Sequence, residues 1–379
     1  MKLLRITTVA TSLGLLKGQL RFLSDNGLEV VAVADNSASR REGATTDELK
    51  EVERTEGVRT VDVAMHREIS LLADLRSLWS LYRLFRREKP DIVHANTPKG
   101  SLLAMLAARL AGVKHRIYTV TGLRFETATG PFRHLLIAME QLTCACATKV
   151  IPEGQGVKKT LIRERITSKQ LHVVHNGNLN GVDLDYTSPD AVEAAKEAPK
   201  NTFNFIFVGR MVRDKGIQEL LDAFVRVNAK HPQTRLILLG RFEPELDPIS
   251  TEAADIIKKH QAIITAGYQN DVRPWLKASD VLVHPSYGEG FPNVILEAGA
   301  MSLPCIVTDI NGSNEIIIPP QNGIIVPPRD SNALEHAMNK LIENSPLADE
   351  MRKNARPMIA ERFDRKDVHR AMLQTYRSL

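Results

Sequence analysis

Short apolar runs alternate with amphipathic segments along almost the whole chain. Runs such as 3–9, 29–34 and 203–209 are rich in Val, Ile, Leu and Phe, and they predict buried strands. Between such runs, apolar residues recur at helical spacing, most clearly over 71–88, where Pro90 lies just beyond the helix. Buried strands that alternate with amphipathic helices indicate an α/β fold, in which helices cover parallel sheets.

The alternating pattern occurs twice and is interrupted by a polar stretch from Asp190 to Asn201. A chain of 379 residues also exceeds the size of one ordinary core. We therefore predict a first domain over 1–185, a linker over 186–201, a second domain over 202–360, and a C-terminal helix over 361–379 that returns to the first domain. Two Rossmann-like domains facing each other across a cleft would bind ligands at the carboxyl ends of their strands.

The segment from Tyr287 to Glu297 combines a loop pattern with a helix pattern. Glu289 lies among glycines ahead of Pro292, a residue that suits the first position of a helix, and Glu297 follows within that helix. One carboxylate on the loop and one on the helix suit two parts of one ligand, while the helix N-terminus suits an anion. The alternative is an unrelated surface-loop glutamate and helix glutamate.

A second candidate site follows the first strand of the second half, where Gly209 precedes Arg210 and Lys215 in a loop before a helix. Arginine and lysine at a helix N-terminus suit a diphosphate, and a solvated basic loop is the alternative. Gly267 and Tyr268 end another strand, where their backbone groups suit a nucleobase. Because these segments share one sheet edge with the glutamate pair, their joint occurrence favours a phosphorylated ligand.

The charge of the chain is uneven between its halves. Residues 1–180 carry 27 Lys and Arg against 18 Asp and Glu, so this half has a balance of +9 and the remainder −4. A basic half indicates a polyanion or an anionic membrane surface, and an ordinary solvated basic face is the alternative. Two strand-end loops in this half, 94–100 and 119–126, are candidates for a second ligand. An apolar face of the segment 132–147 suits either membrane docking or an ordinary core helix.

Several other classes are disfavoured by the sequence. No apolar run is long enough to span a bilayer, and the first residues predict a cytosolic strand rather than a signal peptide. No dinucleotide fingerprint, P-loop or serine-hydrolase elbow occurs. The three cysteines, Cys144, Cys146 and Cys305, lack metal-site spacing and are predicted to be reduced core residues. Asp183 and Asp185 have the spacing of a metal site, but they lie in a polar connection, so no metal site is predicted.

With these motifs in this order and spacing, the chain resembles the family-4 retaining glycosyltransferases of the GT-B fold over nearly its whole length. The resemblance implies that Arg210 and Lys215 neutralise a donor diphosphate, that Glu289 contacts the donor sugar and that Glu297 holds the ribose. Arg210, Lys215 and Glu289 are the catalytic candidates. The residues expected to contact the donor are Gly209, Arg210, Lys215, Gly267, Tyr268, Glu289, Gly290, Phe291, Pro292, Asn293, Val294 and Glu297.

The first half resembles the branch of the family that builds capsular and other surface polysaccharides, through the segments 16–19, 94–100 and 118–125. It departs from the wider family in its first loop and in carrying Thr121 where a histidine is common, which leaves the transfer of a catalytic histidine in doubt. The residues expected to contact the acceptor are Gly14, Lys17, His94, Lys99, Thr121, Gly122 and Arg124.

The resemblance implies metal-independent, retaining transfer of a hexose or N-acetylhexosamine, in which a donor phosphate oxygen helps to accept the acceptor's proton. The expected donor is a nucleotide diphosphate sugar, with a UDP-sugar favoured, and no cofactor is expected. The expected acceptor is a polyprenyl-diphosphate-linked saccharide at the cytoplasmic membrane leaflet, with no nucleic acid partner. Two alternatives remain: a nucleotide-sugar epimerase of the same fold, and a catalytically silent protein that binds sugar nucleotides.

Overall fold

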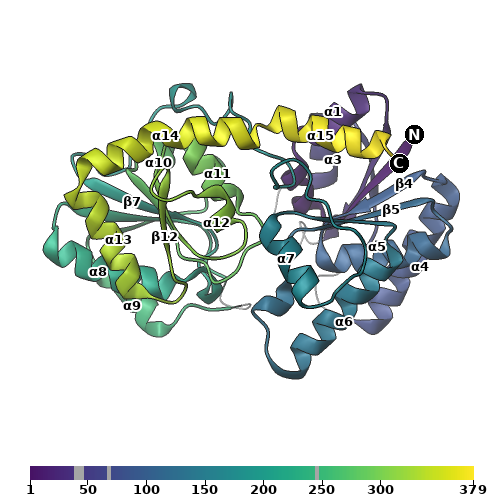
Figure 1. Ribbon diagram of the computed structural model, residues 1–379, viewed down its shortest axis with the longest axis horizontal. Helices are drawn as coiled ribbons and strands as arrows, with labels where there is room; N and C mark the ends of the chain where they lie inside the picture. The colour runs from purple at the N-terminus through teal and green to yellow at the C-terminus, as the bar shows by residue number, and fades with distance from the viewer. Residues whose placement is uncertain (38–46, 66–69, 244–246) are drawn as a thin grey trace. The chain divides into compact units, whose positions relative to one another are not determined.

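The computed structural model describes residues 1–37, 47–65, 70–243 and 247–379. The chain forms two compact units, one made of residues 1–180 with 366–379 and the other of residues 181–365 (Figure 1). Within the described residues, each unit contains a six-stranded sheet whose paired strands are all parallel. The predicted α/β class with two Rossmann-like domains is confirmed.

The strands of the first unit lie in the order β3-β2-β1-β4-β5-β6. They span Lys2–Val9 (β1), Glu29–Asp35 (β2), Arg59–Asp62 (β3), Ile92–Ala95 (β4), His115–Val120 (β5) and Lys149–Pro152 (β6). The helices span Gln19–Asp25 (α1), Glu48–Glu56 (α3), Leu71–Glu88 (α4), Pro98–Leu110 (α5), Gly130–Cys146 (α6), Gln155–Arg163 (α7) and Arg365–Arg377 (α15).

The second unit repeats this plan, with its strands in the order β12-β11-β10-β7-β8-β9. They span Phe203–Val208 (β7), Thr234–Leu239 (β8), Ile263–Gly267 (β9), Val281–His284 (β10), Cys305–Thr308 (β11) and Gly323–Val326 (β12). The helices span Ile217–Lys230 (α8), Thr251–Lys259 (α9), Arg273–Lys277 (α10), Asn293–Ala300 (α11), Ser313–Ile316 (α12), Ser331–Glu343 (α13) and Ser345–Phe363 (α14).

Each sheet has a hydrophobic core on both faces. Successive side chains of a strand point to opposite faces, so Leu4 of β1 joins one core and its neighbour Leu3 joins the other. In β7, Phe205 and Phe207 pack on one face and Ile206 on the other. Burial on both faces explains why these strands read as continuous apolar runs rather than as alternating patterns.

Helix α15 lies at the C-terminal end of the chain, and its residues from 366 on belong to the first unit. Its side chains Met372, Leu373 and Tyr376 join the core that contains Leu3 of β1. The Tyr376 hydroxyl lies 2.5 Å from Nδ1 of His94 and also accepts a hydrogen bond from the buried Arg5. The last helix therefore supplies both apolar and polar contacts to the interior of the first unit.

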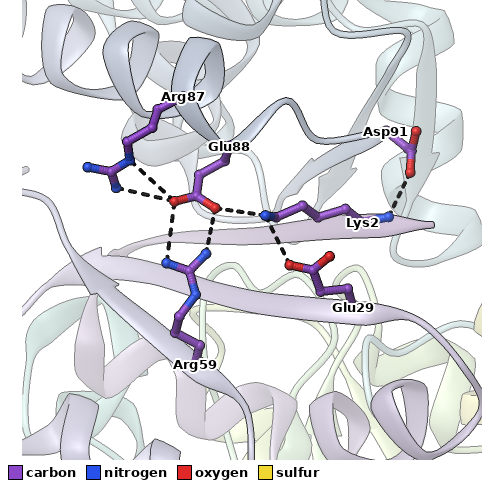
Figure 2. A network of polar contacts seen from close by, with 6 residues as sticks. All are labelled: Lys2, Glu29, Arg59, Arg87, Glu88 and Asp91. Carbon is purple, nitrogen blue, oxygen red and sulfur yellow. Dashed lines mark hydrogen bonds and ion pairs between the residues drawn. The ribbon is translucent and has the colours of Figure 1, made fainter.

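A network of ion pairs joins the amino ends of the strands in the first unit, and we call it the amino-edge network (Figure 2). Glu88, at the end of α4, pairs with Lys2 at 2.8 Å and with Arg59 at 2.6 Å. Lys2 also pairs with Glu29. Hydrogen bonds from Arg59 and then from Lys2 lower the pKa of Glu88 from 4.5 to about 2. The network links the starts of β1, β2 and β3, on the opposite side of the sheet from the carboxyl ends of the strands.

The polar segment over 186–201 is counted with the second unit. Its residues Val192, Ala195 and Ala198 pack with the apolar cluster that contains Ile206. The segment is polar overall, but these three apolar side chains pack into the core of the second unit and hold the segment against it. The expected helix around Glu297 forms as α11, although Pro292 is its N-cap residue rather than its first helical residue.

Candidate functional site

The carboxyl end of β10 leads directly into the loop that carries Glu289. Two cationic or polar partners converge on this carboxylate: the Lys215 ammonium forms an ion pair with it, and Nε2 of His284 lies 3.1 Å from its Oε1. Burial opposes ionisation of Glu289, but Lys215 and the His284 hydrogen bond outweigh it and hold its pKa well below the usual range. The site therefore keeps an ionised glutamate beside a lysine that is 17% exposed.

Two glycines allow the loops of this site to approach each other closely. Gly216 has a φ of +68°, and a Cβ there would lie 2.2 Å from the Pro285 carbonyl oxygen. Gly312 has a φ of +73°, and a Cβ there would lie 2.5 Å from the Gly290 carbonyl oxygen. Both positions combine left-handed backbone with contact to another loop, which only glycine accommodates without strain. They bring the lysine loop and the α12 loop against the two sides of the Glu289 segment.

Arg210 lies on the same loop as Lys215, at the end of β7. Its Nη1 is 2.9 Å from Oε2 of Glu243, and its side chain is 56% exposed. An exposed ion pair contributes little to stability because water competes for both groups. The guanidinium is therefore accessible to an anionic ligand that displaces Glu243, whereas Lys215 is held within the site.

Helix α11 begins beside the Glu289 loop and carries Glu297. Burial, with a smaller contribution from Asp271, raises the pKa of Glu297 to about 7, although Arg365 acts in the opposite direction. Phe291 is buried and its ring packs 5.5 Å from that of Phe363, so only its backbone is available to a ligand. The Phe291 side chain therefore belongs to the protein interior.

Gly267 and Tyr268 lie at the carboxyl end of β9, as the strand pattern predicts. The Tyr268 ring is exposed, and the guanidinium of Arg241 lies 4.1 Å from its centroid. The Gly267 carbonyl accepts a hydrogen bond from Gly240 at the end of the neighbouring strand β8. The exposed Tyr268 ring and the positively charged Arg241 guanidinium over it lie at the same sheet edge as Lys215.

The candidate residues of the first unit separate into two groups. His94 is fully buried, with Nδ1 near the Tyr376 hydroxyl and Nε2 2.7 Å from Oγ1 of Thr119. Burial, and then the charge of Arg5, holds the pKa of His94 well below 6.5. In this arrangement the imidazole is neutral and faces protein groups rather than a ligand.

Lys99, Gly122 and Arg124 lie together around a cavity of about 230 Å³. Lys99 forms a 2.6 Å ion pair with Asp74, which also lines the cavity. Thr121 lies next to this group and donates a hydrogen bond to the Asn96 carbonyl. Gly14 and Lys17, the other two candidates, are in the turn after β1 and do not line this cavity.

The cysteines, the acidic side chains and the long helices bear on other expectations from the sequence. The three cysteines are buried and free, as predicted. Within the described residues, no group of three or more His, Cys, Asp or Glu side chains is placed to hold a metal ion. The Asp183 carboxylate lies 3.1 Å from the Arg365 guanidinium. No helix in the described part of the chain is both long and apolar enough to cross a membrane.

Sequence reasoning missed two features of the second unit. His284 is a packed strand-end residue, stacked on Phe207 as a core histidine would be, but it also contacts Glu289. Its position five residues before the glutamate was the available signal. Arg241 was overlooked although it follows the carboxyl end of β8. Tyr268 was selected because it follows a strand end, and the same rule applies to Arg241.

Comparison with known protein families gives two matches that together span most of the chain. Residues 190–358 match the family described as glycosyl transferases group 1. Residues 16–177 match the glycosyl transferase 4-like domain. The first match contains the lysine loop and both glutamates, and the second contains the cavity residues of the first unit.

Relatives with assigned names match over nearly the full length. The chain is 32% identical, over 87% of its length and 85% of the relative, to the Escherichia coli UDP-Gal:alpha-D-GlcNAc-diphosphoundecaprenol alpha-1,3-galactosyltransferase. It is 28% identical, over 99% of its length and 96% of the relative, to the Staphylococcus aureus capsular polysaccharide biosynthesis glycosyltransferase CapM.

Among solved structures, Anabaena HepE in complex with UDP matches with a TM-score of 0.78 and 19% identity, over 100% of both chains. This similarity shows the fold, and the predicted GT-B fold is confirmed. The identity to the Escherichia coli relative shows the family. The chain is therefore a glycosyltransferase that belongs to the group 1 family.

Proposed function

We propose that the protein transfers a hexose or N-acetylhexosamine from a UDP-sugar to a polyprenyl-diphosphate-linked saccharide during surface polysaccharide synthesis. The observation that carries the proposal is the convergence of Lys215 and His284 on Glu289 at a sheet edge where α11 begins. The names of the Escherichia coli and Staphylococcus aureus relatives support the acceptor and the pathway class. The UDP complex of HepE supports the donor.

In this proposal the protein stabilises the departing nucleotide diphosphate. Breaking the anomeric C–O bond places negative charge on the phosphate, and Lys215, Arg210 and the N-terminus of α11 meet that charge as preorganised electrostatics. Glu289 contacts hydroxyls of the donor sugar, and Glu297 contacts the ribose. Transfer proceeds without a metal because these cations neutralise the leaving diphosphate. It proceeds with retention because the acceptor attacks from the face that the diphosphate leaves, where a donor phosphate oxygen helps to accept the acceptor's proton.

The test is a transfer assay with the full chain, a panel of UDP- and GDP-sugars and a synthetic undecaprenyl-diphosphate N-acetylhexosamine acceptor. We expect transfer from one UDP-sugar, at a rate that chelator leaves unchanged, with the donor's anomeric configuration retained in the product by NMR. Conversion of the nucleotide sugar without acceptor would support an epimerase instead. Binding of UDP without turnover under any acceptor would support a silent binding protein.

A further inference from the structure

The cavity in the first unit differs in character from the donor-binding edge of the second. It is lined by Leu102 and Leu103 of α5, Phe125 of the following loop, and Leu136 and Met139 of α6. Its volume of about 230 Å³ falls below the roughly 300–1,000 Å³ of sites that enclose a drug-sized molecule. The cavity therefore suits an apolar fragment of a larger ligand.

Charged groups also line this cavity. Lys99, in the first turn of α5, is paired with Asp74, and the exposed Arg124 guanidinium has no hydrogen bond or ion pair with any described residue. The N-terminus of the 13-residue α5 adds positive potential. With one carboxylate against two cations, the lining carries a net positive charge that complements a phosphate.

Glu140 also lines the cavity and offsets only part of this charge. Its Oε1 is shielded from solvent and has no hydrogen-bond partner among the described residues, while the Tyr118 hydroxyl bonds to the same carboxyl group. Burial raises the pKa of Glu140 to about 7, which the Tyr118 hydrogen bond opposes. At neutral pH about half of the group is therefore uncharged.

The surface beside the cavity is also apolar. Leu71 lines the cavity and is 76% exposed, and Leu72 and Leu75 of the same helix are exposed as well. On α6, Phe132 and Leu135 are exposed near the lining residues Leu136 and Met139. An apolar chain that leaves the cavity would therefore continue over apolar side chains rather than over charged ones.

We propose that this cavity binds the first isoprene units of a prenyl diphosphate, with Arg124 and Lys99 at the phosphate. The inference rests on the proposed function, since it assigns the lipid carrier of the acceptor to a place in the first unit. It explains why cations, an apolar wall and an apolar exterior occur together there. The lining combines leucine, phenylalanine and methionine side chains with the charged side chains of Lys99 and Arg124, which suits a ligand that has both an apolar chain and an anionic head.

The experiment measures binding of farnesyl diphosphate, farnesol and inorganic pyrophosphate to the full chain by calorimetry. Met139→Trp and Leu136→Trp fill the cavity from positions that are only half-buried, and Leu110→Trp adds the same ring to the exposed C-terminal end of α5, outside the cavity lining, as the matched control. We expect each filling variant to weaken farnesyl diphosphate binding by about tenfold, and the control to bind as the unmodified chain does.

The headgroup is tested by Arg124→Ala, which should weaken farnesyl diphosphate and leave farnesol unchanged. Thermal unfolding of every variant shows whether the fold is kept. Equal farnesyl diphosphate affinity in folded filling variants and in the control would overturn the proposal, as would affinity no higher than that of pyrophosphate. Because this assay contains no sugar donor, the cavity and the transfer reaction fail independently of each other.

Discussion

The amino-edge network of the first unit and the Glu289 cluster of the second are alike in their electrostatics but differ in position. In each, positively charged side chains lower the pKa of a glutamate: Arg59 and Lys2 act on Glu88, and Lys215 acts on Glu289 together with a hydrogen bond to His284. The network joins the amino ends of neighbouring strands (Figure 2), whereas the cluster follows the carboxyl end of β10 and precedes a helix.

The comparison teaches that a perturbed pKa does not by itself identify a functional site. Glu88 contacts partners at the starts of β1 and β3, so its ion pairs hold strands together. Glu289 lies at the carboxyl edge of a parallel α/β sheet, which is the edge at which folds of this class bind anionic ligands. Topology separates a structural cluster from a binding cluster when charge does not.

The largest expected difference follows from removing one lysine from each cluster. Lys215→Met removes a cation from the leaving diphosphate, and we expect kcat/KM for transfer to fall about 100- to 1,000-fold, as for loss of a preorganised donor group. Lys2→Met should keep the rate of the unmodified chain, because Lys2 and its partners lie at the amino ends of the strands in the first unit, away from the carboxyl ends. Similar rates in the two variants would remove the distinction between the clusters.

Two glycines test whether close packing is special to the binding edge. Gly216→Ala places a Cβ against the Pro285 carbonyl in left-handed backbone, and we expect a loss of stability on the order of 1–3 kcal/mol in urea unfolding. Gly57 lies two residues before Arg59 of the amino-edge network. Its φ is nearly the same as that of Gly216, but a Cβ added there would meet open space. Gly57→Ala should therefore cost clearly less, and equal losses would show that the backbone conformation alone decides.

Near neutral pH, Glu297 should titrate whereas Glu289, whose pKa is lowered, should stay ionised. The pKa of Glu297 is about 7, so its carboxylate form, which accepts hydrogen bonds from ribose hydroxyls, grows as pH rises. We expect uridine affinity to increase by up to about tenfold from about pH 6 to about pH 8, and Glu297→Gln to remove this dependence. Uridine lacks phosphates that titrate in this range. A flat profile in the unmodified chain would contradict the ribose assignment.

The smallest effect concerns the amino-edge network itself. The folded pKa of Glu88 lies below its ordinary value of 4.5, so its contribution to stability is present above pH 4.5 and is lost as pH falls toward about 2. We expect Glu88→Gln to lower the free energy of unfolding by about 1 kcal/mol at neutral pH, because partly exposed pairs are screened by water. The difference from the unmodified chain should vanish in acid, and a difference that persists there would point to packing instead.

Local patterns were sufficient to predict the α/β class and the loop and helix that carry Glu289 and Glu297. The boundaries of α4 follow from its apolar spacing and Pro90, and the structure places them at the same residues, Leu71 and Glu88. Glu289 and Glu297 stood out because glycines, a proline and a helix pattern lie within one short segment. Signals of this kind depend only on neighbours in the chain.

The features that were missed depend on residues far apart in the sequence. His94 is directed to protein partners by Tyr376, which lies 282 residues later and which no local pattern connects with it. Glu140 reads as an ordinary helix residue, and only the enclosure formed by α5 and α6 raises its pKa and leaves one oxygen without a partner. Burial of a polar group is a property of the folded chain, so the place of Glu140 in the cavity had no sequence signal, whereas Lys99, Gly122 and Arg124 were predicted from their strand-end loops.

The return of α15 to the first unit has a consequence for biosynthesis. Residues 181–365 form a unit that is continuous in the chain, so all of it is synthesised before residues 366–379 are. The first unit waits for residues 366–379, whose Met372, Leu373 and Tyr376 cover the core around Leu3. The unit whose synthesis begins first is therefore the last to be completed, and until then its apolar face is open to chaperones.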